Sequence, residues 1–308
     1  MATLRPMIRL LLGVAVLGAL LAAPATSHAT LYGFSEQQAA MFSNPLYTKL
    51  KKAKVARYIA PYDVASDRRN LRDKELMDAW MAGARARKVR VLVSFYYDRD
   101  HPLRLPSVAK YTKAMKAFKK AYPDVREISP WNEANRDARR EKRFAGPSAK
   151  TAAKYYLAAR KVFKGRKIVG LDILDGTKIN QTIRYIRAFQ KATRKHPNKI
   201  WGLHNYSDTN RFTSHKTKAI LRAVRGEVWL TETGGLVKFG KNFPRNETRA
   251  AKALKYMFKL AGSNKRIKRL YIYQWTGANP HDVFDAGLVS PDGLKTRKGY
   301  AVVKKKLG

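Results

Sequence analysis

The sequence predicts an α/β fold, a single (β/α)8 TIM barrel, on the basis of three observations. Short apolar runs alternate with longer segments whose apolar residues recur at helical spacing, and this unit repeats eight times. The apolar runs are nearly continuous, as in parallel strands that are buried on both faces. No Gly-x-Gly-x-x-Gly motif follows the first run. A closed barrel, which takes roughly 250 residues, is therefore favoured over a doubly wound sheet.

Residues 1–29 have the three parts of a secretory signal peptide. A basic start precedes the apolar run Leu10–Ala23, and Ala29 ends a small-x-Ala motif. The apolar run is shorter than the roughly 20 residues that a membrane span needs, so cleavage is favoured over a membrane anchor. We therefore expect a protein secreted to the extracellular space or the cell wall, in which residues 30–308 form one barrel domain.

The first four expected strands are short apolar runs, each followed by polar or aromatic residues. They are Leu31–Ser35, Val55–Ala60, Val89–Phe95 and Val125–Pro130. Helices are expected between them because apolar residues such as Trp80 and Ala84 recur at helical spacing. The expected helices are Gln38–Ala53, one from Asn70 as N-cap to Lys88, and one from Ser107 as N-cap to Tyr122, before Pro123.

The second half of the chain continues the alternation to the C-terminus. The expected strands are Lys167–Ile173, Ile200–Tyr206, Val228–Gly235 and Leu270–Trp275. The expected helices are Ser148–Lys164, Asn180–Arg194, Ser214–Ala223, Asn246–Ala261 and Thr296–Lys306. No linker rich in proline, glycine or serine interrupts these units, which is why one domain is expected.

The chain is strongly basic and has no cysteine. It carries 64 Lys and Arg against 22 Asp and Glu, a formal net charge of +42. Such a charge suggests an anionic partner, such as nucleic acid, an acidic polysaccharide or a membrane surface, or else only a solvated surface. The basic residues are spread over nearly every expected helix without interleaved aromatic residues, so we expect no specific nucleic-acid binding. The lack of cysteine excludes thiol catalysis, disulfides and cysteine-bound metal.

Polar and aromatic side chains follow the expected strands, whose own residues are apolar. The carboxyl ends of the strands of a barrel all open on one face, and barrel enzymes build their sites there. The strand-end residues are Arg57, Tyr62, Asp63, Tyr96, Asp98, Asn132, Glu133, Asp172, His204, Asn205, Tyr206, Glu232 and Trp275. We expect these side chains to line one site.

Two carboxylates in this set, Glu133 and Glu232, end the fourth and seventh strands and would face each other across the barrel mouth. Cleavage of a glycosidic bond needs one protonated and one ionised carboxyl group. Arg57 or Tyr206 would keep Glu232 ionised, and Trp275 would offer an apolar plate to a sugar ring.

Each of these assignments has a plain structural alternative. A single strand-end glutamate is usually a solvated loop residue, Trp275 would also suit the core, and His204 would suit a buried, hydrogen-bonded position. The joint pattern favours the site, since all the alternatives would have to coincide at the same strand ends.

The motifs Trp131-Asn132-Glu133 and Leu230-Thr231-Glu232-Thr233-Gly234 resemble those of the clan A glycoside hydrolases, (β/α)8 retaining enzymes with catalytic glutamates on strands four and seven. The resemblance implies Glu133 as general acid/base and Glu232 as nucleophile. It implies hydrolysis of a carbohydrate, with a β-linked glycan favoured, without a cofactor and by a monomer. The implied substrate-binding residues are Asn132, Arg57, His204, Tyr206, Trp275, Tyr96 and Asp98.

Three other functions fit the sequence less well. A metal-dependent hydrolase would need His-x-His on the first strand, which has no histidine, so no metal site is expected. A phosphate-binding barrel would need glycine-rich loops after strands seven and eight, where Glu232 would repel phosphate. The main rival is a non-catalytic basic barrel that binds an anionic cell-wall polysaccharide or another polyanion, which would need neither glutamate.

Overall fold

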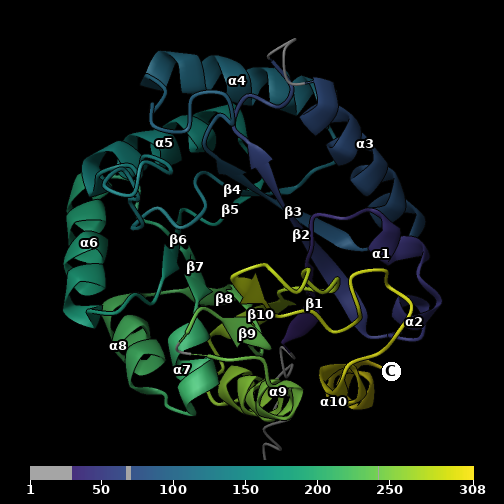
Figure 1. Ribbon diagram of the computed structural model, residues 1–308. Coiled ribbons are helices and arrows are strands. Elements are labelled where there is room, and N and C mark those ends of the chain that lie inside the picture. The colour runs from purple at the N-terminus through teal and green to yellow at the C-terminus, as the bar shows by residue number, and fades with distance from the viewer. Residues whose placement is uncertain (1–29, 67–70, 242) are drawn as a thin grey trace, which may run out of the picture.

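The computed structural model describes residues 30–66, 71–241 and 243–308 and confirms the predicted barrel. All strands of its main sheet run parallel, in the order β5-β4-β3-β2-β1-β10-β8-β7-β6, and the helices form an outer ring (Figure 1). The predicted signal peptide and the predicted N-cap Asn70 lie outside the described residues. The strands are β1 (Leu31–Ser35), β2 (Ala53–Pro61), β3 (Arg90–Tyr96), β4 (Glu127–Ser129), β5 (Lys167–Ile168), β6 (Leu171–Leu174), β7 (Ile200–His204), β8 (Glu227–Thr233) and β10 (Ile267–Ile272).

The fifth predicted strand closes the ring by changing partner halfway along. Its first half, β5, pairs with β4, and its second half, β6, pairs with β7. The change of partner falls between the two residues that link β5 to β6. The N–H of Val169 still donates to the carbonyl of Ile128, next to β5 on β4, whereas the N–H of Gly170 donates to the carbonyl of Ile200 on β7. A Cβ on Gly170 would lie 2.6 Å from the ring of Tyr156, so the change of partner needs glycine here.

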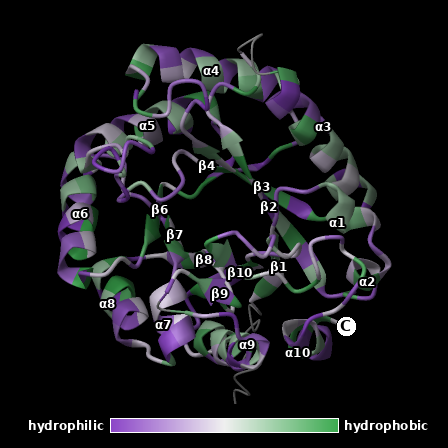
Figure 2. Cartoon of the chain, viewed as in Figure 1, coloured by the Kyte–Doolittle hydropathy of each residue, from purple (hydrophilic) through white to green (hydrophobic). Residues whose placement is uncertain are grey.

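Eight helices of six or more residues surround the barrel in the part of the chain that is described. Ser107 caps α4 as predicted, because its hydroxyl accepts from the backbone N–H of Lys110. Figure 2 shows apolar residues concentrated on the strands and polar residues recurring along the helices. None of the described helices combines the length and apolarity that crossing a bilayer requires. The helices are α3 (Leu71–Ala86), α4 (Val108–Ala121), α5 (Ala149–Val162), α6 (Ile179–Ala192), α7 (Tyr206–Arg211), α8 (His215–Ala223), α9 (Glu247–Gly262) and α10 (Lys298–Leu307).

The helix predicted over Gln38–Ala53 is wrong. Two short helices, α1 (Ala40–Ser43) and α2 (Pro45–Thr48), replace it. Asn44 has an extended backbone and caps the second helix, accepting from the N–H of Leu46 at 2.8 Å. Proline has no N–H to donate and disfavours a helical residue before it, so the first helix stops where the second begins.

The loops after β8 and β10 are joined by a short antiparallel strand pair that the sequence did not predict. Strand β9 (Lys238–Phe239) pairs antiparallel with β11 (Phe284–Asp285). This pairing brings the ring of Phe284 to 5.7 Å from that of Tyr206 and 5.8 Å from that of Tyr273. The sixth strand also ends earlier than expected, at His204, so that Tyr206 begins α7.

Inside the barrel, an apolar layer lies below a polar layer. Successive inward residues of a strand are two apart, and on β2 the apolar Val55 is followed by Arg57. On β8, Trp229 is followed in the same way by Thr231. The lower residues belong to a buried apolar cluster, whereas the upper ones are buried and hydrogen-bonded. The strand period therefore sets a charged layer directly beneath the barrel mouth.

Candidate active site

Arg57, on the inward face of β2, connects most of the site. It is completely buried, and its Nη1 lies 2.7 Å from Oε2 of Glu232. Its Nη2 lies 3.1 Å from Oδ2 of Asp172 and 2.5 Å from Oδ1 of Asn132, while Nε donates to Ser94. The guanidinium presents its donors as a rigid planar fork, so a single side chain fixes acceptors that come from several strands.

Asp172, on β6, is the buried acid that balances this arginine. Its carboxylate accepts from Arg57, from Oγ1 of Thr231 at 2.5 Å, and from Nε2 of His204 at 3.2 Å. Burial alone would raise the pKa of Asp172, but the charges of His204 and Arg57 and these hydrogen bonds hold it well below its usual range. Asp172 is therefore ionised. The sequence placed it among the strand-end residues without giving it a role.

His204, at the end of β7, bridges two carboxylates. Its Nε2 faces Asp172, and its Nδ1 lies 3.2 Å from Oε1 of Glu133. Burial lowers the pKa of His204, but the charges of Glu232 and Asp172 outweigh burial and raise it to about 10. Each ring nitrogen faces a carboxylate, an arrangement that favours the imidazolium, which donates through both nitrogens. Neither His204 nor Arg57 exposes any surface, so in this arrangement both residues contact the glutamates from beneath.

Glu133 follows β4 and is held in an unusual backbone conformation, with φ at 45°. The chain is fixed on both sides, because Asn132 donates to the carbonyl of Phe95 and Ala134 to that of Asp172. One carboxylate oxygen faces His204, and the other lies 2.7 Å from Nη1 of Arg136. Burial raises the pKa of Glu133, yet His204 and Arg136 together lower it to about 2. In this arrangement Glu133 carries a negative charge.

Glu232, on β8, is oriented by both residues that the sequence proposed for it. Arg57 donates to Oε2, and the hydroxyl of Tyr206 lies 3.2 Å from Oε1. The carboxyl group remains slightly exposed, with 11% of the side chain accessible. One oxygen of Glu232, one of Glu133 and a ring nitrogen of His204 all lie within 4.8 Å of one another. The two glutamates that the sequence paired are therefore neighbours at the barrel mouth.

The remaining predicted residues differ in position. Tyr96 is half-buried on β3, and the charge of Glu133 helps to raise its pKa after burial itself. Asp98 instead accepts from the N–H of Asp100 and pairs with His101 at 3.0 Å. These described contacts place Asp98 in the loop beyond β3, with no hydrogen bond to either glutamate.

Trp275, predicted to stack on a sugar, is placed in the core by the structure. Only 1% of it is exposed, because its ring packs edge-on against Phe34 and Tyr47. Strand β10 ends at Ile272, before Trp275 is reached. Tyr273, two residues earlier, is half-buried and near the glutamates, and its pKa is raised by burial and then by the charge of Glu232. Sequence spacing alone did not distinguish the two positions.

Glu133, His204 and Glu232 are also the described side chains that are close enough together to share a metal ion. A metal ion would compete with the contacts that the three side chains already make. Each glutamate accepts from an arginine, and the charges of Glu232 and Asp172 raise the pKa of His204, so metal binding would have to displace a proton from the ring. The cluster is arranged for proton transfer and hydrogen bonding.

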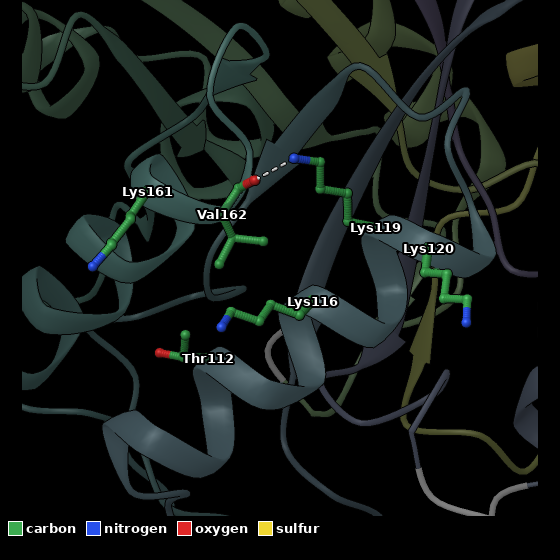
Figure 3. A pocket seen from close by; sticks show the side chains of 6 residues that line it. All are labelled: Thr112, Lys116, Lys119, Lys120, Lys161 and Val162. Atoms are coloured by element: carbon green, nitrogen blue, oxygen red, sulfur yellow. Dashed lines mark hydrogen bonds between the residues drawn. The ribbon is translucent and has the colours of Figure 1, made fainter.

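A hollow that contains neither glutamate lies on the outside of the barrel. It has a volume of about 570 Å³ and lies between α4 and α5 (Figure 3). Lysine side chains line it, and Lys119 donates to the carbonyl of Val162 at 2.8 Å. No carboxylate is among its lining residues, so this hollow offers positive charge without the acids that bond cleavage needs.

Comparisons with known proteins bear on both fold and family. The sequence matches a family model described as the glycosyl hydrolase catalytic core over residues 106–301, and no curated protein matches it. Among solved structures, GH5_18 from Streptomyces cattleya in complex with GlcNAc is similar, with 12% identity, a TM-score of 0.63, and coverage of 90% of this chain and 79% of that one. Xylanase 10B from Thermotoga maritima is similar with 12% identity, a TM-score of 0.62, and coverage of 91% and 95%.

Proposed function

The chain belongs to the glycosyl hydrolase catalytic core family, and on this premise we propose that it is a retaining glycoside hydrolase in which Glu232 is the nucleophile and Glu133 the general acid/base. Membership of the family makes the protein a glycoside hydrolase, in agreement with the predicted resemblance. The mechanism and the roles of the two glutamates are the proposal.

The observation that carries the proposal is the separation of the two carboxyl groups. Oxygens of Glu133 and Glu232 lie within 4.8 Å of each other. Retaining enzymes hold their carboxyl groups roughly 5–5.5 Å apart, whereas inverting enzymes leave about 6.5–9.5 Å for a water molecule. The short separation supports direct attack by one carboxylate on the sugar.

The surroundings of the two groups support different roles for them. Glu232 is hydrogen-bonded by Arg57 and Tyr206 and is slightly exposed, which suits an ionised nucleophile. In the first step it forms a bond to the anomeric carbon while the glycosidic C–O bond breaks and the leaving oxygen takes a proton from Glu133. In the second step water gives its proton to Glu133 and displaces Glu232, which restores both carboxyl groups.

We propose a β-linked glycan as the substrate and secretion as the destination. Similarity to an endo-1,4-beta-xylanase from Caldicellulosiruptor owensensis, at 12% identity and a TM-score of 0.63, over 90% of this chain and 97% of that one, is compatible with such a substrate. The signal-peptide pattern of residues 1–29 supports secretion. N-terminal sequencing of protein recovered from the culture medium tests this: a start at Thr30 is expected, and an intact N-terminus would contradict it.

The function is tested by a screen of glucans, mannans, xylans and galactans with product analysis. Wild type is compared with Glu232→Gln and with Glu227→Gln, a control on the same strand whose side chain accepts from the indole of Trp229 instead. Loss of the nucleophile is expected to lower turnover at least about a thousandfold, and the control to leave it nearly unchanged. Near-normal turnover by folded Glu232→Gln would exclude Glu232 as nucleophile.

A further inference from the structure

The proton donor proposed for this site is engaged on both oxygens before any substrate arrives. His204 is at Oε1 of Glu133, and Arg136 is at Oε2, 2.7 Å away. His204 is completely buried, whereas 41% of the Arg136 side chain is exposed. Arg136 is therefore the partner of Glu133 that a substrate at the barrel mouth can reach.

The backbone places Arg136 over Glu133. The positive φ of Glu133 starts a turn in which the N–H of Arg136 donates to the carbonyl of Glu133 at 2.8 Å. Gly146 packs against this turn, since a Cβ there would lie 2.1 Å from the carbonyl oxygen of Arg136. The turn is fixed, and the side chain extends from it.

The guanidinium of Arg136 rests on an aromatic face. Its central carbon lies 5.2 Å from the ring centre of Phe144, which in turn stacks on Tyr97 at 5.2 Å and 12°. An arginine on such a face keeps its donors directed outward in a plane. Among the described residues, this guanidinium donates only through Nη1, and its one acceptor is Glu133.

A general acid must hold a proton on the oxygen that faces the leaving group, and a bound guanidinium prevents this. The contact with Arg136 helps to keep Glu133 ionised. A neutral sugar at the leaving-group side would have to separate Arg136 from Glu133 without offering Arg136 another negative charge. A sugar that carries a carboxylate would offer Arg136 an equivalent partner and free Oε2 of Glu133 to take up a proton.

We propose that Arg136 is a specificity-determining residue that binds the carboxylate of an acidic, uronic sugar on the leaving-group side of the cleaved bond. The proposal rests on the proposed role of Glu133 as proton donor, and it adds the substrate class. It is consistent with the overall charge of +42, which attracts anionic polysaccharides to the protein.

The test uses pairs of substrates that differ only in the carboxylate. Alginate, hyaluronan and glucuronoxylan are each compared with their carboxyl-reduced forms, and initial rates of reducing-end release are measured. The variants are Arg136→Gln and, as a matched control, Arg139→Gln in the same loop. Arg139 is 58% exposed and pairs with Asp137 instead of with either proposed catalytic residue, so its replacement removes the same charge nearby.

The wild type is expected to prefer at least one acidic polymer over its reduced form. Arg136→Gln should lower that preference in kcat/KM at least about tenfold, the loss expected for one charge-assisted contact. It should also raise the rate on the reduced polymer, because Glu133 is then protonated more readily. Arg139→Gln should leave both rates and the preference unchanged.

A second readout does not need turnover. Calorimetry on Glu232→Gln should find binding of short acidic fragments that weakens at least about tenfold when Arg136→Gln is added, and no such change for reduced fragments. Equal loss on both members of every pair, or equal effects of Arg136→Gln and Arg139→Gln, would overturn the proposal. Failure of the glycosidase mechanism is distinguishable, since Glu232→Gln would then still hydrolyse the polymer.

Discussion

At the scale of single residues, the site is a set of buried charges that stabilise one another. Arg57 and His204 carry positive charge, and Asp172, Glu133 and Glu232 carry negative charge at one barrel mouth. Buried ions lose their hydration, so each is tolerated only because hydrogen bonds and opposite charges replace the lost water. Removing one member leaves its partners uncompensated.

The elevated pKa of His204 gives stability a defined pH dependence. An imidazolium whose pKa rises from 6.5 in the unfolded chain to about 10 in the fold stabilises the protein fully below pH 6.5. This contribution is lost as pH rises from 6.5 towards 10. The free energy of unfolding of wild type, measured with urea, is therefore expected to fall over that range. His204→Gln should be about 3–5 kcal/mol less stable at pH 6, and its free energy of unfolding should change less with pH. Parallel profiles for the two proteins would show that His204 is not protonated in the fold.

The two glutamates are expected to respond differently to azide. With an activated aryl glycoside, Glu133→Ala should still form the glycosyl-enzyme, and azide should speed its breakdown and give a glycosyl azide of retained configuration. In Glu232→Ala the azide takes the place of the missing nucleophile, so an inverted product is expected. NMR of the products checks both outcomes, and the opposite pattern would exchange the two roles.

At the scale of elements, alternation of apolar runs predicted the barrel because strand burial depends mainly on local composition. The alternation did not reveal where a helix is interrupted. One long helix and two short helices that meet at Asn44 and Pro45 would show similar apolar spacing. Whether Trp275 or Tyr273 faces the site likewise depends on where β10 ends, which the sequence did not locate. Motif spacing brought Glu133 and Glu232 together, but the roles of Asp172 and Arg136 depend on side-chain contacts that no sequence period encodes.

The junction of β5 and β6 is expected to depend on Gly170. A Cβ there would lie 2.5 Å from Oδ1 of Asn198 and 2.6 Å from the ring of Tyr156. Gly170→Ala should therefore lower the free energy of unfolding by about 1–3 kcal/mol. Gly262→Ala is the control, because a Cβ at this helix end meets nothing within 4 Å, and a change of no more than about 1 kcal/mol is expected. Equal effects in urea unfolding would show that the junction has room for a side chain.

At the scale of the whole molecule, the net charge of +42 is the property that the glycosidase mechanism does not use. The lysines of the hollow between α4 and α5 belong to it (Figure 3). Exposed lysines also lie on other helices, for example Lys252, Lys255 and Lys259 on α9. A positive charge spread in this way attracts polyanions over much of the surface.

Association with a polyanion is therefore expected to be separable from catalysis. Binding of dextran sulfate should weaken steeply as salt rises, and it should be the same for wild type and Glu232→Gln, because screening acts on surface charge and not on the buried glutamates. Replacing Lys116, Lys120 and Lys161 by glutamine should weaken binding no more than replacing Lys252, Lys255 and Lys259 does. Titrations at several salt concentrations check this. A much larger loss of binding on replacing Lys116, Lys120 and Lys161 would identify the hollow as a dedicated polyanion site. The protein would then bind polyanions at one place and cleave its substrate at another.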